Sequence, residues 1–135
     1  PNLYHTQTWW NYRRLPNILF VHYNDLKADL VGELRRLAAF LAIPLTNDDL
    51  PPLMQAVSLD TMREREARLN QSWRSTFSEG ANTFFFKGTN GRWKDVLTAE
   101  ELALYEEKAA QVLTPDCRAW LEQGRVAFRI DNQMP

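Results

Sequence analysis

The chain has 135 residues, of which 44% are hydrophobic and 24% charged, so its composition is that of an ordinary globular domain. Its 16 basic and 17 acidic side chains give a net charge of -1, which argues against general nucleic-acid binding because such binding requires a basic excess. The single cysteine, Cys117, has no partner for an internal disulfide, and no apolar run has the length of a membrane span. We therefore expect a cytoplasmic protein that contacts neither nucleic acid nor membrane.

The first third of the sequence predicts a helix, a strand and a second helix. An amphipathic helix is expected over 3–14, before Leu15-Pro16, because the residue before proline disfavours helix. The segment 18–23, ILFVHY, is continuously apolar or aromatic, which is typical of a strand buried on both faces of a parallel sheet. A helix is then expected over 27–42, with Asp29 as its cap. Its apolar stripe consists of Leu30, Leu34, Leu37 and Leu41, with Arg35 and Arg36 on the other face.

A buried strand followed by an amphipathic helix is half of a βαβ unit, and one strand cannot complete such a unit. We expect the partner strands to be missing from this sequence, and the remaining edge to favour self-association.

The rest of the sequence predicts further helices and one long connection. Thr46–Asp49 offers caps for a short helix through Ala56, and Ser58 for a helix over 59–69. Residues 70–83 are expected to form an ordered loop or a lid. Thr98 and Glu101 form a capping box for a helix to Val112, Thr114-Pro115 begins the last helix, and Gly124 ends it. For residues 125–130, a strand and a surface extension both remain open.

The segment FFFKGTNGRWK, residues 84–94, carries the most specific chemistry in the sequence. Gly88 allows the backbone to turn so that its N–H groups approach an anion, and Lys87 supplies a compact positive charge. A phosphate clasp is one interpretation, and a tight turn with solvated charges is the other. Tyr23 ends the predicted strand, where ligands bind in open α/β sheets, so it is either a ligand contact or a half-buried aromatic residue.

The remaining reactive side chains point to structural roles. His22 lies within the apolar strand, where we expect a hydrogen-bonded structural imidazole, and His5 lies on the first helix at the surface or at a packed edge. Neither histidine has cysteines or carboxylates at metal-ligand spacing, so no metal site is expected. Cys117 lies in the last helix and is expected to be a core or surface thiol and not a nucleophile.

Four segments, in order, resemble the cytosolic-type sulfotransferases. KGTNGRWKDVLT, 87–98, is similar to the family's Arg-Lys-Gly-x-x-Gly-x-Trp-Lys signature, and 18–45 is similar to its strand ending in Tyr-Glu-Asp and the helix that follows. AVSLDTMRE, 56–64, resembles its Thr-Ser-Phe-x-x-Met stretch, and HTQTWW, 5–10, matches the helix before the strand.

The resemblance implies an α/β, P-loop-NTPase-like sulfotransferase fold, of which residues 1–135 are the C-terminal portion of a single domain, mostly helical with one or two strands. It implies transfer of a sulfuryl group from 3′-phosphoadenosine 5′-phosphosulfate (PAPS) to a small-molecule hydroxyl or amine acceptor, leaving 3′-phosphoadenosine 5′-phosphate (PAP). It places nine residues of this chain at the donor nucleotide: Tyr23, Ser58, Leu59, Met62, Phe84, Phe85, Phe86, Lys87 and Gly88. Lys87 and the Gly88 amide are expected at the 3′-phosphate, and the first four residues near the adenine.

The sequence departs from the family pattern in ways that bear on activity. Phe86 replaces an arginine and Leu59 replaces the adenine-stacking phenylalanine. No stretch matches the family's loop for the 5′-phosphosulfate or its catalytic histidine, so no catalytic residue is assigned, and we expect this chain to be inactive alone. The alternative from another class is a small helical interaction module without nucleotide binding, which would use the helix 3–14 or the helix 27–42 as its surface.

Overall fold

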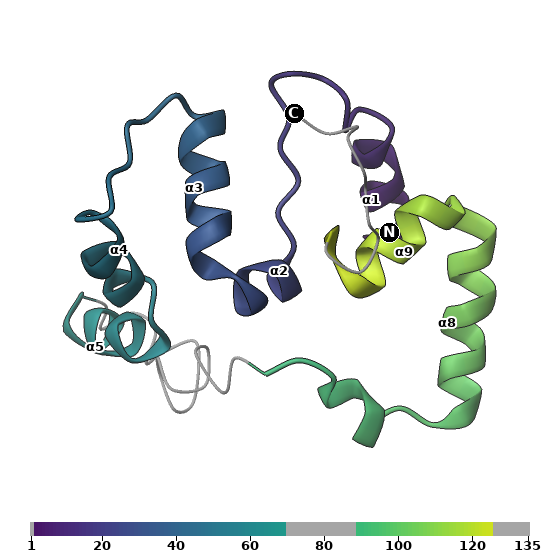
Figure 1. Cartoon of the computed structure of the whole chain (residues 1–135). Helices are drawn as coiled ribbons and strands as arrows, with labels where there is room; N and C mark the ends of the chain where they lie inside the picture. Colours follow the sequence, from purple (N-terminus) through teal and green to yellow (C-terminus); the bar gives the residue numbers. More distant parts are fainter. Residues whose placement is uncertain (1, 70–88, 126–135) are drawn as a thin grey trace. The chain divides into compact units, whose positions relative to one another are not determined.

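A computed structural model of the chain describes residues 2–69 and 89–125. The described helices are α1 (Asn2–Trp10), α2 (Tyr23–Ala28), α3 (Leu30–Phe40), α4 (Leu50–Ala56), α5 (Leu59–Leu69), the short 3-10 helix η1 (Arg92–Asp95), α8 (Ala99–Val112) and α9 (Pro115–Gln123) (Figure 1). The chain divides into two compact units, one of Pro1–Ala42 with Arg92–Pro135 and one of Ile43–Gly91.

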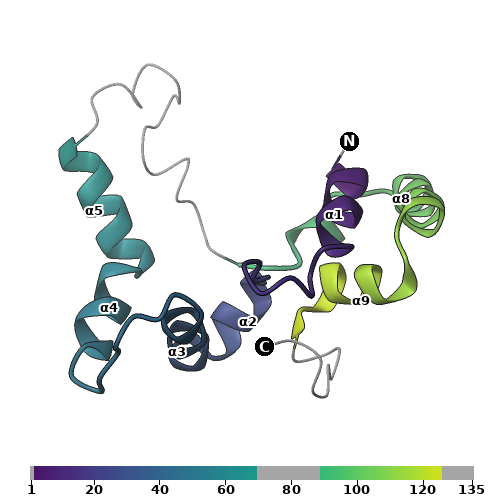
Figure 2. The ribbon, with the colours of Figure 1, turned by 90° about the horizontal axis from the view of Figure 1, so that it is seen from above.

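The core of the first unit lies where α1 packs against α8 and α9, and Figures 1 and 2 both show α1 beside α9. The Trp10 and Trp120 ring centroids lie 5.2 Å apart, and Phe20 meets both rings edge-on. Trp10 also donates from its indole nitrogen to Asp116 Oδ2 at 2.9 Å, which satisfies the only polar group of that side chain. The buried apolar residues of this core are Trp10, Ala109, Leu113, Cys117 and Trp120.

The predicted helix ends in the second half of the first unit follow from local capping. The Thr98 hydroxyl accepts from the Glu101 N–H, and the Glu101 carboxylate accepts from the Thr98 N–H, which confirms the capping box of α8. Thr114 and Pro115 begin α9 as predicted, and Gly124 ends it with φ 84°. Local signals therefore predict where α8 and α9 begin, although at the start of α9 the Thr114 N–H also donates to Gln7 Oε1 of α1 at 2.7 Å.

The first predicted helix is shorter than expected. α1 ends at Trp10, and residues 11–14 continue as turns and not as helix. The reason is visible at Arg13, whose guanidinium pairs with Asp116 at 2.8 Å and also donates to the Trp10 carbonyl at 3.0 Å. This pairing bends the chain back over the α1 terminus before the proline at position 16 is reached.

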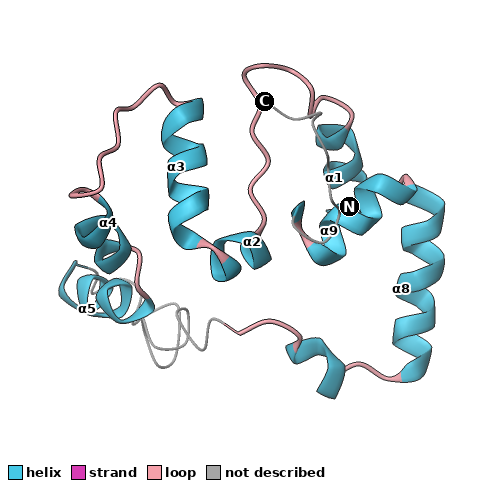
Figure 3. Ribbon diagram, in the orientation of Figure 1, coloured by secondary structure: helices cyan, strands magenta, loops and turns pink. Residues whose placement is uncertain are grey.

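The predicted strand over 18–23 is wrong. Residues 18–22 carry no regular secondary structure, Tyr23 is already the first residue of α2, and no strand occurs among residues 2–69 and 89–125 (Figure 3). A β-strand is defined by a ladder of backbone hydrogen bonds to a neighbouring strand, and an apolar run alone cannot supply that second strand. The backbone at His22 is nevertheless extended, with φ -111° and ψ 138°.

The predicted helix over 27–42 is divided into α2 and α3 at Asp29. The Asp29 side chain accepts from the Gly32 N–H at 2.8 Å, which confirms this residue as the cap of α3. α3 ends at Phe40, and two residues later Ala42 adopts a positive φ of 53°. The predicted position of Arg36 on the outer face of the helix is wrong. Its side chain turns inward, where it donates to the Phe20 carbonyl at 2.9 Å and pairs with Glu33.

In the second unit α4 packs against α5, and Leu50 at the start of α4 is buried. Asp49 precedes α4 but makes no capping bond to it, because its carboxylate accepts from the Thr46 N–H and hydroxyl at 2.8 and 2.6 Å. Ser58 caps α5 as predicted, accepting from the Thr61 N–H at 3.2 Å. The predicted loop 70–83 and all but the first residue of 125–130 lie outside the described residues.

None of the helices that the structure describes is long and apolar enough to cross a lipid bilayer.

Candidate functional site

Tyr23 stands at the point where the apolar segment turns into α2. The helix begins here because the His22 side chain caps it, with Nδ1 accepting the Asn24 N–H at 3.1 Å. The other ring nitrogen, Nε2, lies 3.0 Å from the Leu121 carbonyl, so the ring proton is on Nε2 and is donated there. His22 is therefore the structural imidazole that we expected. The Tyr23 side chain is 48% exposed and accessible to a ligand.

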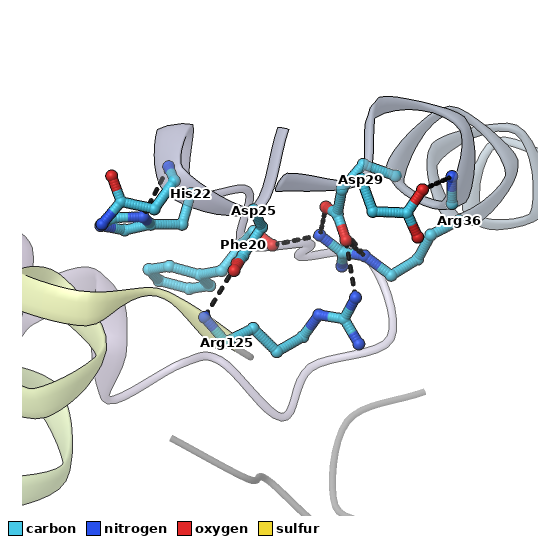
Figure 4. Close-up of polar contacts among 9 residues, drawn as sticks. Phe20, His22, Asp25, Asp29, Arg36 and Arg125 are labelled. Atoms are coloured by element: carbon cyan, nitrogen blue, oxygen red, sulfur yellow. Dashed lines mark hydrogen bonds and ion pairs between the residues drawn. The ribbon is translucent and has the colours of Figure 1, made fainter. Parts of the chain in front are cut away.

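Two residues after Tyr23, Asp25 belongs to an ionic cluster, the Glu33 network, which also contains Glu33, Arg36 and Arg125 (Figure 4). Glu33 is only 1% exposed and accepts from Arg36 at 2.5 Å and from Arg125 at 2.7 Å. Asp25 is 3% exposed and accepts the Arg125 backbone N–H at 2.8 Å. The network thus joins the exit of α9 to the helix that carries Tyr23.

Charge pairing keeps Glu33 ionised despite its burial. Burial by itself raises the pKa of a carboxyl group, but hydrogen bonds and charge attraction from Arg36 and Arg125 outweigh it, so the pKa of Glu33 lies below its ordinary value. A carboxylate held by two guanidinium groups has no acceptor capacity to spare for acid–base chemistry. We infer that the Glu33 network positions the backbone and does not take part in a reaction.

Gly124 is required where this network meets α9. Its φ of 84° is one that other residues rarely adopt, and a Cβ there would lie 2.7 Å from Asp25 Oδ1 and 3.0 Å from His22 Nδ1. The sequence predicted Gly124 only as a helix end. The structure gives it a second role, because its missing side chain is what lets Asp25 reach the Arg125 N–H.

Ser58, Leu59 and Met62 lie together at the start of α5 in the second unit. The Ser58 hydroxyl also lies 2.9 Å from the Thr61 hydroxyl, so it is engaged locally as a cap, and all three side chains are half-buried. The helical spacing of positions 58, 59 and 62 brings these residues onto adjacent positions of one turn. Because Tyr23 belongs to the other unit, the structure describes it separately from these three.

The remaining predicted site residues, Phe84, Phe85, Phe86, Lys87 and Gly88, lie outside the described residues. The same signature continues into η1, which the structure does describe. Trp93 is 50% exposed there, with the Lys94 ammonium 5.8 Å from its ring centre, and it borders a pocket of about 400 Å³ with Leu97 and Tyr105. The Trp93 ring is therefore only partly covered by the rest of the chain.

Cys117 is a core thiol. It is fully buried, and that burial raises its pKa to about 11, so the thiolate needed for nucleophilic attack is not formed at neutral pH. Among residues 2–69 and 89–125, no three His, Cys, Asp or Glu side chains gather closely enough to hold a metal ion.

Comparison with known proteins identifies the family. A profile described as "Sulfotransferase domain" matches residues 2–114. This chain belongs to the sulfotransferase family. A glycolipid sulfotransferase of Mycobacterium bovis (strain BCG / Pasteur 1173P2) is 37% identical over 126 residues, which cover 93% of this chain and 38% of the relative.

Two further sulfotransferases extend the comparison. The glycolipid sulfotransferase of Mycobacterium tuberculosis (strain ATCC 25177 / H37Ra) is 36% identical over 93% of this chain and 39% of its own length. Human sulfotransferase 1C2 is 29% identical over 76% of this chain and 35% of its own length. The chain thus spans about two fifths of the length of these two mycobacterial relatives. No solved structure matches it.

Sequence reasoning missed the Glu33 network. Glu33 and Arg36 are three residues apart on one helix, which is the spacing of an ion pair, and this signal was available in the sequence. What the sequence did not contain is any sign that Arg125, 92 residues further on, joins them. Without that second guanidinium group, a glutamate beside an apolar stripe is expected at the surface.

Proposed function

We propose that this chain provides part of the donor-nucleotide pocket of a sulfotransferase, which moves a sulfuryl group from PAPS to a hydroxyl or amine group and leaves PAP. The observation that carries the proposal is the sulfotransferase profile over 2–114, since it spans the predicted nucleotide residues from Tyr23 to Gly88. The family match also argues against the alternative of a helical interaction module without nucleotide binding.

The proposed donor pocket combines positive charge for the 3′-phosphate with apolar contacts for the adenine. Lys87 and the Gly88 amide neutralise the 3′-phosphate, because a compact ammonium beside a free backbone N–H is well suited to a phosphate oxygen. Phe84, Phe85 and Phe86 fix the loop that closes over the nucleotide. Tyr23, Ser58, Leu59 and Met62 contact the adenine, for which apolar packing with a few polar groups is suitable. Support comes from the exposed Tyr23 ring and from the position of the other three on one helical turn.

The proposal assigns no catalytic base to this chain. Sulfuryl transfer depends on positioning and on stabilising charge at the transferred group, and no stretch of the sequence matches the family's loop for the 5′-phosphosulfate or its catalytic histidine. We propose that residues 1–135 are the C-terminal part of one sulfotransferase domain and do not catalyse transfer alone. The single cysteine supports a reducing, cytoplasmic setting.

For the acceptor, we propose a small molecule with a hydroxyl or amine group. The first class to try is a glycolipid, because two mycobacterial relatives that cover 93% of this chain are named glycolipid sulfotransferases.

Calorimetric titration with PAP tests the nucleotide site. We expect Lys87→Ala to weaken PAP binding by roughly 10-fold or more, because a hydrogen bond to a charged group contributes about 1.5 to 3 kcal/mol. The matched control is Lys108→Ala, which removes an exposed lysine on α8 and should leave PAP affinity unchanged. Equal affinities in the two variants would contradict the assignment of Lys87. Absence of PAP binding, both by the chain alone and by the chain paired with the unmatched part of a relative, would contradict the proposed function.

A further inference from the structure

The pocket of about 400 Å³ beside Trp93 has a lining suited to a small ligand. None of the residues in its wall belongs to the proposed donor site. The wall combines two aromatic rings, two leucines and two carboxylates, which come from η1 and the turn after it, from α8 and from α9: Trp93, Leu97, Tyr105, Glu106, Leu121 and Glu122. A concave site of this size, mostly apolar with a few converging polar groups, is typical of a small-molecule pocket.

The charged side chains in the wall of this pocket are both carboxylates. Arg118, behind them, donates from Nε to Glu122 Oε1 at 2.7 Å and pairs through Nη2 with Glu106 Oε2. The second oxygens, Glu106 Oε1 and Glu122 Oε2, accept from no donor among residues 2–69 and 89–125. Two carboxylates held by one guanidinium keep one negative charge in excess, so a positively charged donor in the pocket has acceptors to bind.

Glu122 is held in place from two helices. The Tyr105 hydroxyl of α8 donates to Glu122 Oε1 at 3.1 Å, and Arg118 holds the same oxygen from within α9. Burial and the neighbouring Glu122 charge raise the pKa of Tyr105, so its hydroxyl stays protonated and continues to donate. A carboxylate that is already oriented loses little conformational freedom when a ligand binds, which favours affinity.

The Trp93 ring adds an attraction that is specific for cations. A cation within about 6 Å of an indole centre is drawn to the electron-rich ring face, and the Lys94 ammonium already lies 5.8 Å from the centre of this ring. Leu97 and Leu121 supply apolar contact for the carbon part of a ligand. An anion would be repelled by the carboxylates, and a neutral molecule would gain neither the ionic nor the ring attraction.

We propose that this pocket binds a primary organic ammonium ion, with its N–H groups donating to Glu106 and Glu122 and its apolar part against Trp93. A primary ammonium suits the free oxygens because it supplies several N–H donors. Its nitrogen has no lone pair, so it cannot attack sulfur while it is protonated. The pocket is therefore a binding site separate from any position where an amine accepts a sulfuryl group, and the proposal does not rest on the proposed function.

A matched pair of probes tests the charge requirement. Phenethylamine is protonated at neutral pH, and 2-phenylethanol has the same ring and chain with a neutral hydroxyl group in place of the ammonium. Each is titrated into the 135-residue chain while the Trp93 indole N–H resonance is followed by NMR. We expect phenethylammonium to bind roughly 5-fold or more tightly than the alcohol. Equal affinities, or no shift of the Trp93 resonance, overturn the proposal.

Two neighbouring glutamates locate the ammonium group. Glu106→Gln removes a charge from the pocket and should weaken phenethylammonium roughly 3-fold or more, because the contact is partly exposed to water. Glu107→Gln makes the same change one position further along α8, outside the pocket wall, and should have no effect. The Glu106 side chain is 60% exposed, so this change disturbs no buried core. Equal affinities in the two variants overturn the role of Glu106.

Two tryptophans of equal exposure locate the apolar part of the ligand. Trp93→Ala should weaken phenethylammonium roughly 5-fold or more. Trp9→Ala should leave its affinity unchanged, because Trp9 lines a different feature, an open apolar groove of about 700 Å³ along residues 17–21. Circular dichroism checks that both variants fold. A loss in Trp9→Ala and none in Trp93→Ala would assign the ligand to that groove and overturn the proposal.

Lys87→Ala separates this site from the proposed donor pocket. It should leave phenethylammonium affinity unchanged, since Lys87 has no part in the ammonium site. A loss of amine binding in Lys87→Ala would place the ligand in the donor pocket and overturn the proposal. PAP binding without amine binding contradicts the ammonium site alone, and amine binding without PAP binding contradicts the proposed function alone.

Discussion

In the α1–α8–α9 core, the buried side chains are apolar or aromatic. In α2 and α3, all of whose residues the structure describes, the only buried side chains are the carboxylates of Asp25 and Glu33. The apolar stripe of α3 behaves in the opposite way: Leu30, Leu34 and Leu37 are half-buried and Leu41 is exposed. One part of the first unit therefore buries its hydrophobic groups internally, whereas the other part is held by charges and leaves Leu37 and Leu41 lining an open apolar groove.

This difference separates two ways in which the chain holds its helices in place. Apolar burial is non-directional and stabilises a core on its own. A network of guanidinium and carboxylate groups contributes less net stability but fixes direction, because each hydrogen bond has a set geometry. The Glu33 network holds α2 and α3 in place without covering the leucines. The leucines of this stripe thus stay accessible while α2 and α3 are already oriented.

The largest effect is expected from the apolar core. Trp10→Ala removes a side chain that is 1% exposed and contacts both Trp120 and Phe20, so we expect a loss of about 3 to 5 kcal/mol in the free energy of unfolding. Urea denaturation followed by circular dichroism measures it. Trp9→Ala removes the neighbouring ring, which is 49% exposed, and should cost far less. Similar losses in both variants would show that the core does not depend on Trp10.

The next largest effect is expected where the two regions meet. Gly124→Ala introduces a Cβ at a positive φ and directly against Asp25, so we expect a loss of about 3 kcal/mol, near the upper limit for a strained backbone position. Ala42→Gly is the opposite case, because an alanine already stands at a φ of 53° and the change to glycine relieves strain. Thermal unfolding of both variants should therefore move in opposite directions.

A smaller effect is expected from the charged region. Glu33→Gln keeps the shape of the side chain but removes the charge that Arg36 and Arg125 share, so we expect a loss of about 2 kcal/mol at neutral pH. Asp60→Asn is the control, because the Asp60–Arg63 pair has the same i,i+3 spacing but Asp60 is 88% exposed. A loss in the control as large as in Glu33→Gln would mean that burial adds nothing to the network.

The smallest expected effect is a change in pH dependence. Because the pKa of Glu33 is lowered in the folded chain, its ionised form stabilises the fold above the ordinary carboxyl pKa of about 4.3, and this contribution is lost as the pH falls through and below that value. Glu33→Gln should therefore flatten the decline in unfolding free energy between neutral and acidic pH. An unchanged pH profile in the variant would place the titrating groups elsewhere, with Asp116 as the next candidate because its pKa is also lowered.

Sequence reasoning succeeded where structure depends on neighbours in the chain. The Thr98–Glu101 box, Asp29, Ser58 and Gly124 are local signals, and each stands at the helix end that it predicted. The strand over 18–23 failed for the converse reason, since a ladder needs a second strand and none occurs among the described residues.

The candidate site shows the same difference between features set by neighbouring residues and features set by distant ones. Ser58, Leu59 and Met62 could be placed at the start of their helix from sequence, and the family was correctly identified from its motifs, whereas Tyr23 was predicted to end a strand and instead begins α2. The inward turn of Arg36 and the burial of Glu33 could not be predicted, because they involve the Phe20 carbonyl and the Arg125 guanidinium, which lie 16 and 92 positions away in the chain. The roles of Phe84–Gly88 remain predictions from the resemblance.

The hydrogen bond between Trp10 and Asp116 joins residues 106 positions apart in the chain, and that between Asp25 and Arg125 joins residues 100 apart. During synthesis, α1 is made before α8 and α9, the helices that bury its tryptophan, by roughly the length of this separation. At typical synthesis rates, this interval is roughly 5 to 20 s. During that time Trp10 is exposed in the nascent chain, and a chaperone that binds short aromatic segments has its best opportunity there.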